Sequence, residues 1–212
     1  MPYVLHLSVS PSGDNSYSRK LSKAFFESFS AEHSSVEIKT RDLAAEPIPH
    51  LDGEAIFAGY TPADQRSPSA AAKHQFRLDL IDEISKAAAI VVDTPMWNWN
   101  TPSVLKAYID QIIIPGLFDT NSKTLAGKPV TLLVACGGAY GEGSWHPEWD
   151  HLSPYLTLIF KNLGATDVEL IRTEYTLAGV VPGMEGLVGK KEESLVAATA
   201  AATQRAKVAF SA

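Results

Sequence analysis

A short run of hydroxyl and amide side chains near the start of the sequence has the residue types that bind a phosphate group. It reads SPSGDNSYS from Ser10 onward, between an apolar stretch at 3–9 and a helical stripe of apolar residues that begins at Leu21. A strand that passes through such a loop into a helix offers unpaired backbone N–H groups and the positive end of the helix dipole to an anion. The hydroxyl groups of Ser10, Ser16 and Ser18 add donors for phosphate oxygens. A helix cap alone needs one such side chain, so their number favours a phosphate site.

Two widespread phosphate-binding motifs are missing from the sequence. No G-x-G-x-x-G follows the first apolar stretch, and no G-x-x-x-x-G-K-[ST] occurs. Both the dinucleotide fingerprint and the P-loop are therefore disfavoured. A mononucleotide held by serines fits the loop better.

A second candidate segment has side chains that suit a flat ring. Met96, Trp97, Asn98 and Trp99 follow the continuously apolar stretch 89–93. The tryptophans supply aromatic faces and the asparagine supplies an amide. Packing in the core or at a subunit interface is the alternative for the two tryptophans, because aromatic residues are enriched in both places.

A third candidate segment follows the apolar stretch 128–135. It is Cys136-Gly137-Gly138. The two glycines let the backbone approach a ligand closely. This segment is therefore a further candidate for contact with the ring.

Apolar periodicity divides the chain into alternating strands and helices. The predicted strands are 3–9, 36–43 (as an edge strand), 89–93, 128–135 and 167–175. The predicted helices are 16–32, 70–88, one that begins at Pro102 with Thr101 as its N-cap, 149–163 and 184–210. Gly164 follows the fourth helix as its expected C′ residue.

The segment 46–69 is the least regular part of the sequence. It contains four prolines together with the apolar residues Ile56, Phe57 and Tyr60. Loops this long are commonly lids, binding loops or interface arms. A meandering surface connection is the alternative.

Five strands separated by helices predict an α/β protein with a doubly wound parallel sheet. We expect one domain over residues 1–212. Ligands bind such sheets beyond the carboxyl ends of the strands, at the point where the strand order reverses. In the order 2-1-3-4-5, the loops after strands one, three and four meet at one crevice. This convergence is the central prediction, because it brings the phosphate loop and the two ring-binding segments together.

Composition argues against several classes of partner. A net charge of −6 without a run of Lys or Arg disfavours nucleic acid and anionic membrane surfaces. The sequence has no apolar run of membrane-spanning length and no pattern of a secretory signal. One cysteine cannot form an internal disulfide, which favours a reducing, cytoplasmic setting.

These segments together resemble the FMN-dependent NADH-azoreductase family, relatives of the flavodoxin-like NAD(P)H quinone reductases. The resemblance spans nearly the whole chain. It is carried by Ser10 with Ser16-Tyr17-Ser18, by 41–54, by 95–110, by Gly137-Gly138 and by 163–174. It implies a flavodoxin-like fold with helices on both faces of the sheet and a homodimer with one FMN per subunit at the dimer interface.

The resemblance also implies where the cofactor binds and what the protein does. The FMN phosphate is expected on Ser10 and the turn Ser16-Tyr17-Ser18. The isoalloxazine ring is expected against Met96-Trp97-Asn98-Trp99 and the loop Cys136-Gly137-Gly138. The implied reaction is two-electron, ping-pong hydride transfer from NADH or NADPH to the flavin, and then to a quinone or an azo compound. The flavin carries this chemistry, so no protein side chain is expected to be catalytic.

Three residues are expected beside the acceptor. Tyr140 follows the glycine pair, where the family places an aromatic residue or a histidine, and is expected to form a wall of the site; an exposed loop tyrosine is the alternative. Phe57 and Tyr60 are expected to reach over the flavin of the partner subunit as a hydrophobic lid. Two departures bear on substrate range: Ala135-Cys136 stands where family members often have Ser-Arg, and 111–125 is shorter and lacks an aromatic pair.

Other chemistries remain open on the residues alone. Cys136 with His146 would suit a hydrolase with a cysteine nucleophile, although a lone cysteine at a strand end is usually a small buried hydrophobe. A polar cluster downstream has the residue types of metal ligands but no standard spacing, so no metal is expected. Its members are Glu142, His146, Glu148, Asp150 and His151. A third class is an electron carrier or a flavin-binding protein without this turnover.

Overall fold

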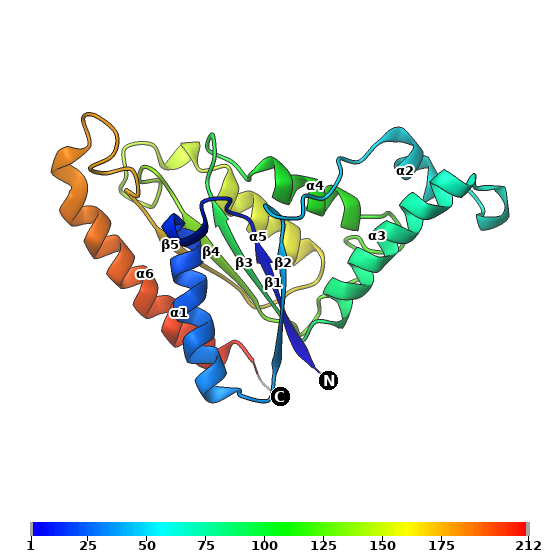
Figure 1. Cartoon of the computed structure of the whole chain (residues 1–212), viewed down its shortest axis with the longest axis horizontal. Coiled ribbons are helices and arrows are strands. Elements are labelled where there is room, and N and C mark those ends of the chain that lie inside the picture. The colour runs from blue at the N-terminus through cyan, green and yellow to red at the C-terminus, as the bar shows by residue number, and fades with distance from the viewer. Residues whose placement is uncertain (1, 211–212) are drawn as a thin grey trace.

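The strands form one parallel sheet, in which the N-terminal strand lies beside the central strand. The computed structural model describes residues 2–210, and its sheet has the order β2-β1-β3-β4-β5 (Figure 1). All neighbouring strands are parallel. The strands are β1 Tyr3–Ser8, β2 Glu37–Asp42, β3 Ala89–Pro95, β4 Val130–Ala135 and β5 Val168–Thr173. The predicted fold class and strand order are therefore confirmed, with β2 at the predicted edge.

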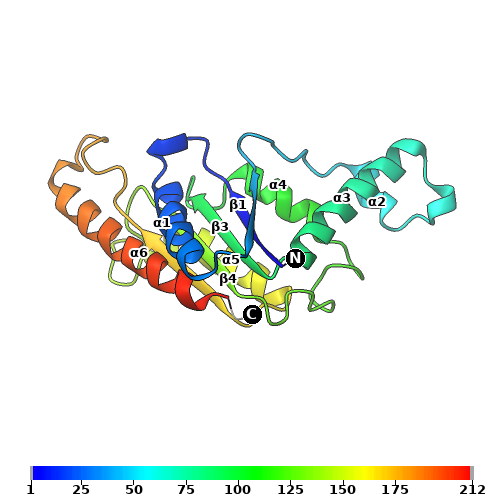
Figure 2. The same ribbon diagram turned by 60° about the horizontal axis from the view of Figure 1, so that its bottom comes forward.

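Helices cover both faces of this sheet (Figures 1 and 2). They are α1 Tyr17–Glu32, α2 Gly53–Ala58, α3 Pro68–Lys86, α4 Ser103–Ile112, α5 Leu152–Asn162 and α6 Val188–Val208. Helices α1 and α6 pack side by side on one face, and α3, α4 and α5 lie on the other. The short helix α2 lies at the far end of the molecule, against α3.

The core lies in two layers because successive side chains of a strand point to opposite faces. In β1, Val4 belongs to a cluster with Phe25 of α1 and Ala202 of α6. The next residue, Leu5, belongs to the other cluster, which includes Leu80 of α3. Both faces of the sheet are thus covered, which explains why the residues of its central strands are almost all buried and mostly apolar.

Two details of the helices differ from the prediction. The segment 46–69, expected to be irregular, contains α2, which the Asp52 carboxylate caps by accepting a hydrogen bond from the Ala55 N–H at 2.8 Å. Thr101 does not cap α4, because the N-cap is Pro102 and the helix begins at Ser103. The first difference is a short helix that was not predicted, whereas the second concerns only which of two neighbouring residues caps a helix.

The last two helices begin later than predicted. Helix α5 begins at Leu152 after a 3₁₀ turn at Pro147–Trp149, and α6 begins at Val188 after a 3₁₀ turn at Glu185–Leu187. The predicted end of α5 is confirmed: Gly164 has a φ of +105°. The N–H groups of Gly164 and Ala165 return to carbonyls of the last turn, as in a Schellman motif.

Within residues 2–210, none of the helices combines the length and the apolar character needed to cross a bilayer.

Candidate functional site

A cavity opens where the carboxyl ends of the strands meet the start of α1. Its volume is about 260 Å³. The loops after β1, β3, β4 and β5 all contribute to its wall. Its lining residues are Ser10, Ser12, Asn15, Ser16, Tyr17, Pro95, Met96, Trp97, Ala135, Gly137, Thr176 and Leu177. The three segments singled out in the sequence therefore do converge on one crevice.

The loop after β1 presents hydrogen-bond donors to this cavity. Ser16 is the N-cap of α1: its Oγ accepts a hydrogen bond from the Arg19 N–H at 3.3 Å, and its carbonyl accepts one from Lys20. The first N–H groups of a helix have no intrahelical partner. Those of Tyr17 and Ser18 are thus left for a ligand, at the positive end of the helix dipole.

The opposite side of this loop is held by an arginine. The Arg19 guanidinium donates to the Ser10 carbonyl at 3.0 and 2.7 Å, and to the Asp42 carboxylate at 2.7 Å. The Ser10 hydroxyl accepts a hydrogen bond from the Ser12 N–H at 3.3 Å, so its own proton is available to an anion. Arg19 therefore fixes the loop through its backbone, while Asp42 offsets its charge.

The Ser18 side chain lies beneath the loop and does not line the cavity. It is fully buried and donates to Asp93 Oδ1 at 3.1 Å. Its oxygen also lies 3.1 Å from Ser16 Oγ. The structure thus leaves the Ser18 N–H, but not its hydroxyl, on the ligand side.

The segment after β3 is a two-residue turn. The backbones of Trp97 and Asn100 exchange two hydrogen bonds of 3.0 Å, and the residues between them, Asn98 and Trp99, have φ values of 48° and 63°. Positive φ at both central positions is the geometry of a type I′ turn, in which asparagine is favoured. The turn gives the Trp97 indole a defined place at the cavity rim.

The two tryptophans of this turn have different surroundings. Trp97 is 43% exposed and lines the cavity. Trp99 is 46% exposed and contacts the Trp149 ring edge to face, with 5.4 Å between the centroids. Met96 is buried and lines the cavity. Neither tryptophan is a core residue in this chain.

The third segment is held by the loop that follows β5, the neighbour of β4 in the sheet. The carbonyls of Cys136, Gly137 and Gly138 accept hydrogen bonds from the N–H groups of residues 175–177. A Cβ at Gly137 would come within 2.7 Å of Leu177 Cδ1. A side chain at position 137 would therefore have to displace the Leu177 side chain, which covers this glycine from the neighbouring loop.

Cys136 has its thiol in the core rather than in the crevice. The side chain is fully buried, and burial raises the pKa of the Cys136 thiol to about 12. A thiol of this kind stays protonated near neutral pH, whereas the thiolate is the nucleophile. His146 stacks on Trp149 instead, with 4.0 Å between the ring centroids. The hypothesis of a cysteine nucleophile is therefore wrong, and only the backbone of Cys136 belongs to the loop.

The downstream polar cluster is used for structure. Asp150 accepts hydrogen bonds from the first N–H groups of α5 and from Arg172 at 2.9 Å. His146 hydrogen-bonds with Glu148 at 3.1 Å. Across residues 2–210, no three side chains of metal-binding type come together as a potential site.

Tyr140 lies against the glycine pair. Its phenol oxygen would be 3.2 Å from a Cβ at Gly138. The N–H groups of Tyr140 and Gly141 donate to Glu174 Oε1 at 2.7 and 2.8 Å, which fixes this part of the loop. Burial raises the pKa of the Tyr140 phenol, and this neutral side chain packs beside the glycine pair.

The side chains of Phe57 and Tyr60 do not approach this crevice within one chain. They are 69% and 68% exposed, on and just after α2, at the opposite end of the molecule from α1 and α6 (Figure 1). Any contact that these aromatic residues make with a cofactor must therefore involve a second molecule.

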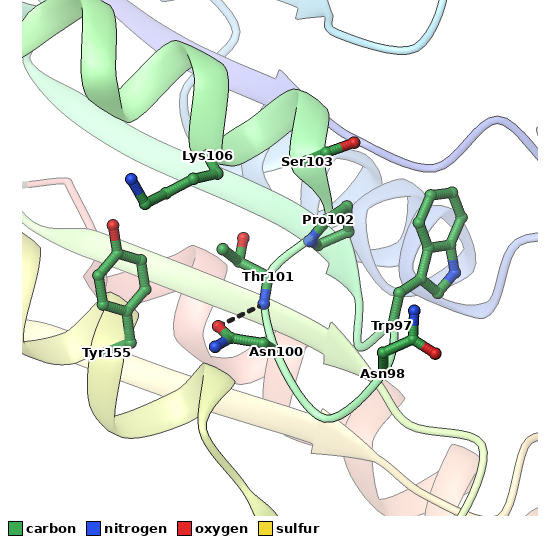
Figure 3. A pocket seen from close by; sticks show the side chains of 8 residues that line it. All are labelled: Trp97, Asn98, Asn100, Thr101, Pro102, Ser103, Lys106 and Tyr155. Atoms are coloured by element: carbon green, nitrogen blue, oxygen red, sulfur yellow. Dashed lines mark hydrogen bonds between the residues drawn. The ribbon is translucent and has the colours of Figure 1, made fainter. Parts of the chain in front are cut away.

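A second cavity lies on the other side of the tryptophan turn, between α4 and α5 (Figure 3). Its volume is about 450 Å³. Trp97 and Asn98 line it together with Lys106 of α4 and Tyr155 of α5, which face each other across the opening. Trp97 thus belongs to the walls of both cavities.

Several lining residues were not predicted from the sequence. Thr176 and Leu177 follow β5, and Tyr155 and Lys106 come from helices. Thr176 and Leu177 could have been predicted, because β5 is the neighbour of β4 and the loop after β5 must emerge at the same edge of the sheet.

Comparisons of sequence point to one group of proteins. A family model described as a flavodoxin-like fold matches residues 3–206. An FMN-dependent NADH:quinone oxidoreductase of Frankia casuarinae is 39% identical over 211 residues, which is 98% of this chain and 100% of that protein. A protein with the same name from Alcanivorax borkumensis is 40% identical over 176 residues, 81% of this chain and 87% of that protein.

Comparison of structures shows the same fold in azoreductases. An azoreductase from Bacillus anthracis has a TM-score of 0.85 and 23% identity, over 98% of this chain and 100% of that chain. An FMN-dependent NADH-azoreductase from Bacillus anthracis in complex with FMN has a TM-score of 0.82 and 22% identity, over 98% and 99% of the two chains.

Proposed function

This chain belongs to the flavodoxin-like family, and from this membership we propose that it is an FMN-dependent NADH:quinone oxidoreductase that also reduces azo compounds. The observation that carries the proposal is the convergence of four strand-end loops on one crevice whose wall includes both a helix N-terminus and Trp97. Such a crevice has separate places for an anionic group and for a flat ring.

The residues of the crevice fit FMN. The Ser10 hydroxyl and the N–H groups of Tyr17 and Ser18 would hold the phosphate, beside the Ser16 side chain, whose hydroxyl proton goes to Ser18. Trp97 would lie along the ring, with Met96, Asn98 and Trp99 completing the turn. The glycine pair after Cys136 would let the ring approach the backbone closely, because neither glycine has a side chain.

When bound, FMN supplies the hydride-transfer chemistry between NADH and the acceptor. The protein binds and orients its reactants. Two hydrogen bonds between Trp97 and Asn100 hold the turn that contains Asn98 and Trp99. The carbonyls of Gly137 and Gly138 accept hydrogen bonds from the loop after β5, which hold the third segment. Fixed backbone dipoles of this kind stabilise developing charge without having to reorganise. Tyr140 contributes as a neutral wall, and we assign no catalytic side chain.

Turnover is the test of this proposal. The apoprotein reconstituted with FMN is expected to oxidise NADH in the presence of a simple quinone, with the parallel-line kinetics of a ping-pong mechanism. Assays with NADPH in place of NADH define the donor preference, and an azo dye tests the second acceptor. An FMN-loaded protein that leaves NADH unconsumed would instead be an electron carrier or a flavin-binding protein.

We further propose that the protein is a homodimer in which α2 of one subunit covers the crevice of the other. Ile56, Phe57 and Tyr60 form an exposed apolar group on and after α2, and exposed groups of this kind mark interaction sites. Arg77, itself buried, holds α2 in place by donating to the carbonyls of Ala55 at 3.1 Å and of Gln111 at 2.8 Å. A group presented so rigidly is suited to an interface.

The double variant Phe57→Ala/Tyr60→Ala tests this arrangement. We expect a KM for the quinone raised by about tenfold, since two large apolar contacts worth about 1.5 kcal/mol or more are lost, together with a weaker dimer in sedimentation equilibrium. Val196→Ala, which trims a similarly exposed residue on α6, is the control. An unchanged KM and an unchanged dimer would remove the lid and the interface from the proposal.

We also propose that the protein acts in the cytoplasm. Its only cysteine is buried and unpaired, which suits a reducing compartment, and NADH is available there. Recovery of the protein in the periplasmic or membrane fraction of its native cell would contradict this location.

A further inference from the structure

A buried carboxylate lies directly under the loop that follows β1. Asp93, in β3, has no exposed surface. Its Oδ2 accepts hydrogen bonds from His6 Nε2 at 2.6 Å and from the Ser22 hydroxyl at 3.2 Å, and its Oδ1 accepts one from the Ser18 hydroxyl at 3.1 Å. A buried carboxylate is costly unless such donors surround it. Three polar side chains therefore hold Asp93 in this place.

Asp93 holds the loop from both of its ends. Its backbone carbonyl accepts a hydrogen bond of 3.1 Å from the Val9 N–H, immediately before Ser10. Its side chain holds Ser18 at the other end, in the first turn of α1. The loop that lines the cavity thus begins and ends on the same residue of the central sheet.

The direction of the hydrogen bonds around Ser18 shows that Asp93 also fixes the N-cap of α1. An ionised carboxylate only accepts hydrogen bonds, so Ser18 must give its single hydroxyl proton to Asp93. In the 3.1 Å contact between the two serines, Ser18 is then the acceptor and Ser16 the donor. The chain from Ser16 through Ser18 to Asp93 fixes the N-cap, and with it the orientation of the N–H groups of Tyr17 and Ser18.

Resting on the proposed function, we propose that Asp93 is a positioning residue for the phosphate end of FMN. It does not touch the ligand. It acts through Ser18 and Ser16, and keeps the donors of the helix N-terminus in the geometry that binds phosphate, which lowers the ordering cost of binding. Its effect is therefore confined to the phosphate and leaves the ring contacts unchanged.

An electrostatic role and a positioning role for Asp93 predict opposite changes in FMN affinity when the carboxylate is neutralised. A negative carboxylate near a phosphate site repels the phosphate, so a purely electrostatic role predicts that Asp93→Asn binds FMN more tightly. The positioning role predicts weaker binding, because the amide cannot satisfy Ser18 and His6 in the same way. The sign of the change in affinity distinguishes the two.

The experiment compares FMN with riboflavin, which has the same ring without the phosphate. Dissociation constants are measured for the apoprotein by quenching of flavin fluorescence. For Asp93→Asn, we expect the Kd for FMN to rise about tenfold, equivalent to about 1.4 kcal/mol, while the Kd for riboflavin stays within about twofold. Ser18→Ala, a small deletion at a buried position, is expected to reproduce this selective loss and serves if Asp93→Asn does not fold.

Ser22→Ala is the matched control. It removes a hydroxyl donor from the same carboxylate, but Ser22 bonds only to Asp93 and to the Arg19 carbonyl and has no link to Ser16. We expect its ratio of riboflavin to FMN affinity to equal that of the wild type. Equal losses for FMN and riboflavin in Asp93→Asn, or tighter FMN binding, would overturn the positioning role. A wild-type apoprotein that binds neither flavin would overturn the proposed function itself.

Discussion

Replacing Ser16 with aspartate is expected to weaken FMN binding at least a hundredfold while leaving the helix and riboflavin binding intact. Aspartate is as good an N-cap as serine, and a negative charge is favourable at a helix N-terminus, so α1 keeps its cap. The new carboxylate, however, would lie next to the place proposed for the phosphate. Two like charges about 4 Å apart repel by about 4 kcal/mol at an effective dielectric of about 20, and a hundredfold loss needs only about 2.8 kcal/mol.

The matched variant for this prediction is Ser16→Asn. Asparagine has nearly the shape of aspartate and caps a helix equally well, but it is neutral. FMN and riboflavin are titrated into both apoproteins, and the melting temperatures of the two are compared. If Ser16→Asp and Ser16→Asn bind FMN with the same affinity, then the phosphate does not bind at the N-terminus of α1.

Replacing Gly164 with alanine is expected to lower the free energy of unfolding by about 3 kcal/mol or more. Gly164 ends α5 with a φ of +105°, a conformation that costs a residue with a Cβ about 1–2 kcal/mol. A Cβ there would also lie 2.7 Å from the Cα and 2.9 Å from the carbonyl carbon of Lys123. These are backbone atoms, so the clash cannot be relieved by turning a side chain.

Gly127→Ala separates the two contributions. Gly127 also has a positive φ, +74°, but nothing lies within 4 Å of a Cβ built on it. We expect this variant to lose only the conformational part, about 1 kcal/mol. In thermal unfolding of a chain of this size, Gly164→Ala should melt about 6–12 °C below the wild type, at about 2–4 °C per kcal/mol. If the two variants lose the same free energy of unfolding, then the contact with Lys123 does not contribute to the cost of a side chain at position 164.

The fold followed from local patterns in the sequence. The apolar run at β3 predicted a strand in the buried centre of a parallel sheet, and the strand order was confirmed. The end of α5 was also predictable, because a glycine after a helix has a local conformational cause. By contrast, α2 was missed, since six residues among prolines give too short a periodic signal and its cap at Asp52 is a hydrogen-bond detail.

The site was predictable only in part. Strand order alone brings the loops after β1, β3 and β4 to one edge of the sheet, so the crevice could be expected before the structure was known. The direction of individual side chains could not. Cys136 faces the core, and Leu177, which was not predicted, covers Gly137. Phe57 and Tyr60, expected over the flavin of the partner subunit, lie far from the crevice of their own chain, and their place in a dimer stays a prediction.

The sequence by itself determined the order of the elements and which of their faces are apolar, because these are properties of residues a few positions apart. Only the tertiary structure decided what each polar side chain of the loop bonds to. Ser18 and Asp93 are 75 positions apart in sequence, and nothing local to either one indicates that the serine donates its proton to a carboxylate under the loop. Hydrogen bonds are directional and short in range, so their partners are known only once the strands and α1 are in place.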